Sequence, residues 1–200
     1  MKNMNVGILV FDEFESLDAF GPAEIFGRLK EQYKVTFYSQ AGGSVRNSHG
    51  VEIITQILGN NIKDLEIFLI PGGYGTRKEV DNRRLIDLIR QVSESARYTL
   101  TVCTGSALLA KTGLLDGKKA TSNKRAFSWA ITCGPDVQWI KKARWTIDGK
   151  YYTSSGVSAG MDMTLGFLSD LHGEAFAREV ARQIEFDWQE NKDDDKFCDL

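Results

Sequence analysis

Continuous apolar runs that alternate with helical patterns constrain the fold of this chain more than any other feature. Residues 6–11, 67–70 and 98–102 have the length and continuity of strands that are buried on both faces, and residues 35–38 predict a further strand. The segments between them carry apolar residues at spacings of three and four, as in amphipathic helices. Strands that alternate with helices in this way predict an α/β fold with a mostly parallel sheet covered on both faces.

Local signals predict where individual elements begin and end. Pro22 is expected to open a helix, Asp81 to cap the start of another, and Gly113 to end a third. Glycines in residues 41–57 predict a β-hairpin at the sheet edge. Short strands are expected within residues 137–154, turned by Asp148-Gly149, and two helices over about 158–171 and 173–190.

The length of 200 residues favours a single domain, which we expect over residues 1–190, followed by a solvated acidic tail over residues 191–200. A net charge of −2 argues against nucleic acid as a partner, because binding phosphates requires an excess of basic residues. The early apolar run is too short for a signal peptide, and no run approaches the roughly 18 apolar residues of a membrane helix. We therefore expect a cytoplasmic protein with no membrane partner.

Cysteine and histidine are scarce. The chain has three Cys and two His, with no CxxC or HxxxH spacing, so we expect neither a metal site nor a disulfide framework. His49 and His172 follow no predicted core strand and are expected to be solvated or capping residues. Cys133 is expected before a loop, and Cys198 in a frayed tail.

Open parallel sheets bind ligands at the carboxyl ends of their strands, which directs attention to residues 12–24, 71–75 and 103–106. Cys103 lies between a β run and a helix of small residues, the context of a nucleophile elbow. We expect the amino end of that helix to lower the pKa of the Cys103 thiol. The alternative is a buried structural cysteine.

The Pro71-Gly72-Gly73 segment follows the second apolar run. Glycine lets backbone N–H groups approach a reacting atom, so the amides of Gly72, Gly73 and Thr104 are candidates for an oxyanion hole, although the segment could also be a simple tight turn. It does not match a dinucleotide fingerprint, because the GxGxxG spacing and a helix directly after it are both missing.

Asp18 is the first candidate for an acid that shares a proton with Cys103, and Glu15 is the second. Both follow the first apolar run, whose carboxyl end would lie near that of the Cys103 strand. The alternative for Asp18 is a helix cap. Glu24 is expected at the surface.

Several of these segments, taken together, resemble the DJ-1/PfpI superfamily, which is class I glutamine amidotransferase-like. The resemblance covers about residues 4–190 and rests on Leu17-Asp18 with Gly21-Pro22, Pro71-Gly72-Gly73, Val102-Cys103-Thr104-Gly105, and residues 153–162. It implies a flavodoxin-like three-layer sandwich with an added β-hairpin and a nucleophilic cysteine. The pattern is most similar to the branch that contains isonitrile hydratases and the amidase-like sensor domains of AraC-type regulators.

Two departures from the family pattern restrict the function that the resemblance implies. Asn123 stands where peptidase-like members carry a histidine, which argues against protease activity. The chain ends at Leu200 without a helix-turn-helix domain, which argues against a transcription factor.

The resemblance thus implies a small-molecule enzyme that hydrates isonitriles without a cofactor or metal. Cys103, Asp18 and Thr104 would be catalytic, Gly72 and Gly73 would bind substrate, and Glu15 and Asn123 are secondary candidates. A homodimer is expected. Alternatives are a redox or stress-response protein, a glyoxalase- or amidase-type hydrolase, a protease-like member, and a ligand sensor without catalysis.

Overall fold

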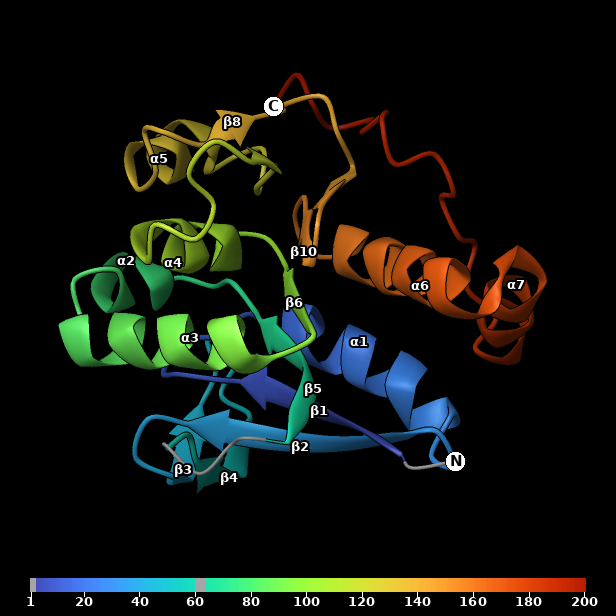
Figure 1. Ribbon diagram of the computed structural model, residues 1–200, viewed down its shortest axis with the longest axis horizontal. Coiled ribbons are helices and arrows are strands. Elements are labelled where there is room, and N and C mark those ends of the chain that lie inside the picture. The colour runs from blue at the N-terminus through green and yellow to red at the C-terminus, as the bar shows by residue number, and fades with distance from the viewer. Residues whose placement is uncertain (1–2, 60–63) are drawn as a thin grey trace.

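A mostly parallel sheet forms the centre of the molecule (Figure 1). The computed structural model describes residues 3–59 and 64–200, and within them eight strands form this sheet. In spatial order the strands are β3 (Gly43–Arg46), β4 (Glu52–Ile57), β2 (Tyr33–Ser39), β1 (Met4–Leu9), β5 (Leu65–Ile70), β6 (Tyr98–Thr101), β10 (Tyr151–Ser154) and β9 (Trp145–Asp148). The strands from β4 to β10 pair in parallel, whereas β3 and β9 pair antiparallel at the two edges.

The central strands are apolar because helices cover both of their faces. Val6 and Ile8 in β1 and Ile67 to Ile70 in β5 are fully buried. Gly7 lies where a Cβ atom would come within 2.6 Å of the Leu65 side chain, so this position of β1 accepts no side chain without a shift of its neighbour. The continuous apolar runs therefore predicted the sheet correctly, although β1 ends at Leu9 rather than at residue 11.

Two layers of helices enclose the sheet (Figure 1). One layer holds α1 (Ser16–Arg28), α6 (Ala159–His172) and α7 (Glu174–Gln183). The other holds α2 (Thr76–Glu79), α3 (Arg83–Ser95) and α4 (Gly105–Lys111). This arrangement confirms the three-layer α/β sandwich. Among the described residues, no helix is both long enough and apolar enough to cross a membrane.

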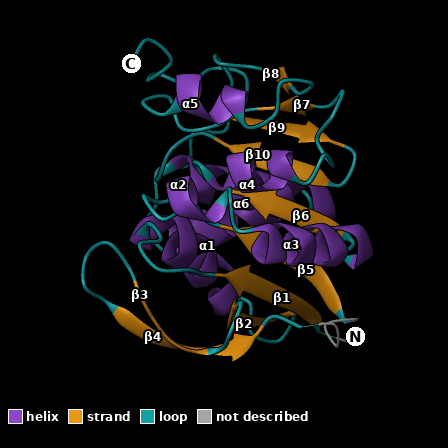
Figure 2. Cartoon of the chain, turned by 90° about the vertical axis from the view of Figure 1, so that its left-hand side faces the viewer, coloured by secondary structure: helices purple, strands orange, loops and turns teal. Residues whose placement is uncertain are grey.

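A β-hairpin lies at each edge of the sheet (Figure 2). The hairpin expected over residues 41–57 is present as β3 and β4 and lies at one edge. At the other end, β9 and β10 form the expected hairpin around Asp148-Gly149. Beyond them lie α5 (Phe127–Thr132) and a small parallel pair made of β7 (Lys119–Ala120) and β8 (Gln138–Trp139).

Three predicted helix boundaries, two starts and one end, were wrong. Helix α1 begins at Ser16, so Pro22 lies inside it rather than at its start, because burial of Ala19, Pro22 and Ile25 outweighs the hydrogen bond that proline removes. Asn82, not Asp81, caps α3 by accepting a hydrogen bond from the Leu85 amide at 3.2 Å. Helix α7 ends at Gln183 rather than near residue 190.

Contrary to our expectation, the C-terminal tail is not simply solvated. It runs from α7 back to the end of the sheet where α5 lies (Figure 1). Asp195 in the tail is only 1% exposed and lies 3.3 Å from the Arg144 guanidinium and 3.7 Å from the Lys124 ammonium. Buried cations attract this carboxylate, which composition alone assigned to solvent.

Candidate active site

The predicted site residues follow strands β1, β5 and β6, which are central strands whose carboxyl ends lie on the same side of the sheet. Asp18 follows β1, Gly72 and Gly73 follow β5, and Cys103 follows β6. The neighbouring strand β10 adds a fourth segment, residues 155–158. Parallel pairing of these strands therefore brings together residues that are far apart in the sequence.

Cys103 has the backbone of a nucleophile elbow. Its φ is +57°, a left-handed conformation that costs a residue other than glycine about 1–3 kcal/mol. Three hydrogen bonds of 3.0 Å hold it: the Cys103 N–H donates to the Ser155 carbonyl, and the Ser106 and Ser122 hydroxyls donate to the Cys103 carbonyl. Gly105 completes the turn, because a Cβ atom there would lie 2.2 Å from the Ile70 carbonyl oxygen.

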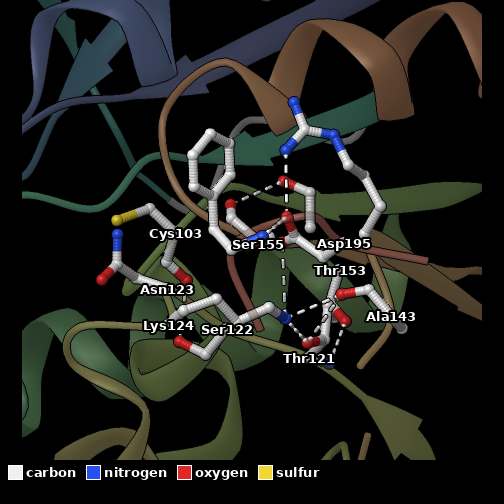
Figure 3. A network of polar contacts seen from close by, with 12 residues as sticks. Cys103, Thr121, Ser122, Asn123, Lys124, Ala143, Thr153, Ser155 and Asp195 are labelled. Atoms are coloured by element: carbon white, nitrogen blue, oxygen red, sulfur yellow. Dashed lines mark hydrogen bonds and ion pairs between the residues drawn. The ribbon is translucent and has the colours of Figure 1, made fainter. Parts of the chain in front are cut away.

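Three N–H donors surround the sulfur of Cys103. They are the backbone amides of Thr104 and Val157 and the side-chain amide of Asn123. Figure 3 shows the nitrogen of Asn123 turned toward the sulfur. The Asn123 oxygen accepts a hydrogen bond from the Ala126 amide at 3.0 Å, which fixes the orientation of the side chain. These donors favour a thiolate over a thiol.

Burial outweighs the donors. Cys103 is 7% exposed, and burial together with the nearby Asp18 carboxyl raises the pKa of its thiol. Our expectation of a pKa lowered by the following helix was therefore wrong. Loss of solvent disfavours the thiolate more strongly than the local N–H donors stabilise it.

Asp18 is fully buried beside Cys103, in the first turn of α1. Its Oδ2 accepts a hydrogen bond from the Gly72 amide at 2.9 Å, whereas its Oδ1 has no hydrogen-bond partner among the described residues. Burial raises the pKa of Asp18 to about 8, and the Glu15 carboxylate adds to the shift. At neutral pH, Asp18 therefore holds a proton that it can donate.

The glycine loop plays a different part from the one we expected. The Gly72 amide donates to Asp18 and the Gly73 amide donates to the Thr104 hydroxyl at 3.2 Å, so both amides are already hydrogen-bonded within the protein. A Cβ atom on Gly72 would lie 2.6 Å from the Thr104 amide nitrogen and 2.9 Å from the Cys103 Cβ. Glycine thus allows the loop to pack directly against the elbow.

A helix also follows this loop directly, contrary to our expectation. Helix α2 begins at Thr76, and it spans only four residues. The Thr76 hydroxyl donates to the Thr104 hydroxyl at 3.0 Å, which ties the loop after β5 to the elbow after β6.

The cysteine lines a pocket of about 430 Å³. Of the predicted residues, Cys103, Thr104, Gly73, Glu15 and Asn123 line it. Asp18 and Gly72 are buried and are not among its lining residues. The structure thus places Asp18 next to the sulfur, and Glu15 on the wall of the pocket.

Sequence reasoning missed five other lining residues. They are Tyr74, Arg77, Arg125, Ala126 and Val157. Val157 had a usable signal, because it follows β10 at the same edge of the sheet, but residues 151–153 were not assigned to the central sheet. Its φ of +47° turns its amide toward Cys103, a feature that no sequence pattern displays.

Neither histidine lines the pocket. His49 is exposed; its Nδ1 lies 2.6 Å from the Ser16 hydroxyl and 3.8 Å from the Glu15 carboxylate. His172 is exposed at the end of α6, and its Nε2 lies 2.6 Å from the Tyr33 hydroxyl. In the part of the chain that the structure describes, no cluster of three or more His, Cys, Asp or Glu side chains is arranged to hold a metal ion.

Comparison with known proteins gave consistent matches. The family model described as DJ-1/PfpI family matches residues 4–170. The chain is 30% identical over 183 residues to an isonitrile hydratase of Pseudomonas putida, with 92% of this chain and 78% of that protein covered. A solved structure of a THiJ/PfpI family protein from Pseudomonas syringae superposes with a TM-score of 0.80 at 27% identity, with 94% of this chain and 76% of that chain covered.

Other relatives have different names. The chain is 27% identical over 195 residues to the HTH-type transcriptional regulator GbdR of Pseudomonas aeruginosa, with 95% of this chain but only 53% of the regulator covered. It therefore spans about half the length of that relative. It is 25% identical over 154 residues to a deglycase of Pyrococcus horikoshii, with 76% of this chain and 89% of the deglycase covered.

Proposed function

The chain belongs to the DJ-1/PfpI family, and from this premise we propose that it is a cysteine-dependent enzyme that hydrates isonitriles to N-substituted formamides. The similarity to an isonitrile hydratase supports the reaction. The observation that carries the proposal is the buried pair of Cys103 and Asp18, with no imidazole on the pocket lining to act as a base. One proton shared by the pair supplies the acid–base chemistry that a histidine supplies elsewhere.

The first step forms a covalent adduct. The reaction begins from the form of the pair that has already lost one proton to solvent, in which Cys103 is a thiolate and Asp18 is protonated. The Cys103 sulfur attacks the terminal carbon of the isonitrile, and a C–S bond forms. The Asp18 carboxyl gives its proton to the same carbon, which produces a thioimidate on the enzyme and leaves Asp18 as a carboxylate. A pKa of about 8 keeps Asp18 protonated before this step.

Water completes the reaction. The Asp18 carboxylate takes a proton from a water molecule, whose oxygen adds to the thioimidate carbon, and returns that proton to the nitrogen. Collapse of the tetrahedral adduct breaks the C–S bond, forms the formamide carbonyl and returns the hydroxyl proton to Asp18. The enzyme ends with the same protons with which it began, and the net change is the addition of one water.

The groups around the sulfur have supporting roles in this scheme. The amides of Thr104 and Val157 and the side chain of Asn123 stabilise negative charge on the sulfur as it attacks and as it leaves. The Gly73 amide is bonded to Thr104, so we assign the glycine loop to positioning Asp18 and Thr104 rather than to holding an oxyanion.

The surroundings of Cys103 favour attack on a substrate bound in the pocket over a redox-sensing role, because Asp18 can give its proton to such a substrate as the sulfur attacks. Thiols that oxidise readily are exposed and have a low pKa. Cys103 is buried, and its pKa is raised. Hydrolysis of aldehyde adducts stays the second candidate, because the chain also resembles a deglycase over most of that protein's length.

The proposal is tested by product analysis of the wild-type protein and variants. Each is incubated with cyclohexyl isocyanide, a glyoxal and a primary amide, and the products are identified by NMR. The informative variants are Cys103→Ala and Asp18→Asn. Glu15→Gln tests the second carboxylate, and Cys133→Ala is the matched control, because Cys133 is also buried but does not line the pocket.

We expect N-cyclohexylformamide from the wild-type protein and from Cys133→Ala, and none above background from Cys103→Ala or Asp18→Asn. Turnover of the glyoxal alone would replace this proposal with the second candidate. Full activity in Asp18→Asn together with loss in Glu15→Gln would transfer the acid–base role to Glu15.

A further inference from the structure

Two arginines lie on the wall of the pocket that contains Cys103. Arg77 comes from α2, and Arg125 comes from the segment between β7 and α5. The guanidinium carbon of Arg77 lies 4.1 Å from the centre of the Trp129 ring in α5. This stacking contact holds Arg77 toward the segment that carries Arg125.

Within residues 3–59 and 64–200, no anionic side chain pairs with either guanidinium group. Among the residues that the structure describes, neither Arg77 nor Arg125 takes part in an ion pair. Arg77 makes one hydrogen bond, to the Thr76 hydroxyl at 3.3 Å, and most of its donors stay open. An arginine without a carboxylate partner in a pocket is suited to bind an anionic ligand.

The net charge of the residues that line the pocket also favours an anionic ligand. Two arginines face one described carboxylate, that of Glu15, which leaves a net charge of +1. Asp18 lies behind the lining and adds no negative charge while it is protonated. A net charge of +1 matches a singly charged carboxylate better than a dianionic phosphate.

We propose that the substrate carries a carboxylate that Arg77 and Arg125 bind while its reacting carbon faces Cys103. This inference rests on the proposed function and makes isonitriles that bear a carboxylate its preferred substrates. Guanidinium groups bind carboxylates through paired N–H donors, which fix the orientation of the ligand as well as hold it. A pocket of about 430 Å³ accommodates a small molecule of this kind.

Alkylation of Cys103 tests the anionic site without requiring any isonitrile activity. The sulfur displaces iodide from iodoacetate, which is an anion, or from iodoacetamide, which is neutral and of nearly the same size. The fraction of thiolate enters both rates equally, so a change in their ratio between variants reports the attraction of the pocket for the negative charge of iodoacetate. Peptide mass spectrometry assigns the label to Cys103 rather than to Cys133 or Cys198.

The variants are Arg77→Gln, Arg125→Gln, the double variant, Arg125→Lys and Lys78→Gln. We expect the ratio of iodoacetate to iodoacetamide rates to fall about three-fold in each single glutamine variant and about ten-fold in the double variant. Arg125→Lys, which keeps the charge, should retain most of the ratio. Lys78→Gln removes an exposed charge of the same helix that does not line the pocket, and it should leave the ratio unchanged. An unchanged ratio in the double variant would overturn the inference.

A substrate pair separates this inference from the proposed function. We expect kcat/KM for isocyanoacetate to exceed that for its methyl ester, and the double variant to lose the preference. Equal turnover of acid and ester by the wild-type protein would overturn the inference and leave the proposed function intact. If neither isonitrile is hydrated but the alkylation ratio responds as described, the anionic site stands and the proposed function fails.

Discussion

Asp18 places a carboxyl group where negative charge is unfavourable. It is fully buried, and its Oδ1 has no described partner. The pKa of about 8 means that the folded protein binds this proton far more tightly than the unfolded chain, for which the value is 3.8. Between these two pH values the native state holds more protons than the unfolded state, so the free energy of unfolding falls as pH rises.

Asp18→Asn is expected to remove this pH dependence. Asparagine resembles the protonated acid, so the variant should gain stability over the wild-type protein on the order of a few kcal/mol at pH 8 and none at pH 4. Urea unfolding at pH 4, 6 and 8 measures the difference, and Asp87→Asn is the control, because Asp87 is an exposed residue of α3. Parallel stability curves for the wild-type protein and Asp18→Asn would contradict a raised pKa.

Asn123 donates to the Cys103 sulfur, so its replacement should make the thiolate harder to form. In Asn123→Ala the donor is lost, and in Asn123→Asp a carboxylate oxygen replaces it while the bond to the Ala126 amide is kept. We expect the pH midpoint of Cys103 alkylation by iodoacetamide to rise by about one unit in the first variant and further in the second. A midpoint that does not move in Asn123→Asp would show that the donor does not act on the sulfur.

Cys103, Asp18 and the glycine loop could be found from the sequence, because each follows a buried apolar run. The direction of the thiol pKa could not, since it depends on how deeply neighbouring elements bury the sulfur. Val157, Arg77 and Arg125 were missed for a related reason. The backbone angle of Val157 and the stacking of Arg77 on Trp129 are not visible in the local sequence, and no local pattern marked Arg125.

At the level of elements, the C-terminal tail joins two of the segments that supply donors to Cys103, namely the segment of Asn123 and the segment of Val157. Figure 3 shows Lys124, the residue after Asn123, directed toward Asp195. The Lys124 ammonium also donates to the Thr121 hydroxyl and the Ala143 carbonyl, and its side chain is 2% exposed. Arg144 links Asp195 to the other segment, through Ser158 at 3.1 Å.

Removal of the Asp195 carboxylate should therefore destabilise the protein. Asp195→Ala leaves two buried cations without this partner, for which we expect a loss of about 3–5 kcal/mol in the free energy of unfolding. Asp194→Ala is the matched control, because Asp194 forms an exposed ion pair with Lys142 and its loss should cost less than about 1 kcal/mol. Urea denaturation measures both. Equal losses in the two variants would mean that the buried ion pairs of Asp195 stabilise the protein no more than an exposed pair does.

The elements themselves could be predicted in part. Apolar runs identified the central strands, and the glycines of residues 41–57 and Asp148-Gly149 identified the two hairpins, because these signals are local. The start of α1 could not be read from Pro22, since tertiary burial decides whether a helix continues through a proline. The burial of Asp195 depends on cations from distant parts of the chain, which no local pattern reveals.

On the scale of the whole molecule, the parallel sheet makes the site. Strands β1, β5, β6 and β10 are adjacent and point the same way, so the segments after them converge on Cys103. The rule that ligands bind at the carboxyl ends of parallel strands predicts a site at this end of the sheet. The homodimer and the cytoplasmic location stay predictions.

The central claim is that Cys103 and Asp18 act as one unit on an isonitrile. The most direct test is a double-mutant cycle, in which formamide production from cyclohexyl isocyanide is measured for the wild-type protein, Cys103→Ala, Asp18→Asn and the double variant. Residues that act as a unit give losses that do not add. We predict a loss of at least about a thousand-fold in each single variant and no further loss in the double variant. Wild-type turnover in Asp18→Asn, or losses that multiply in the double variant, would contradict the account.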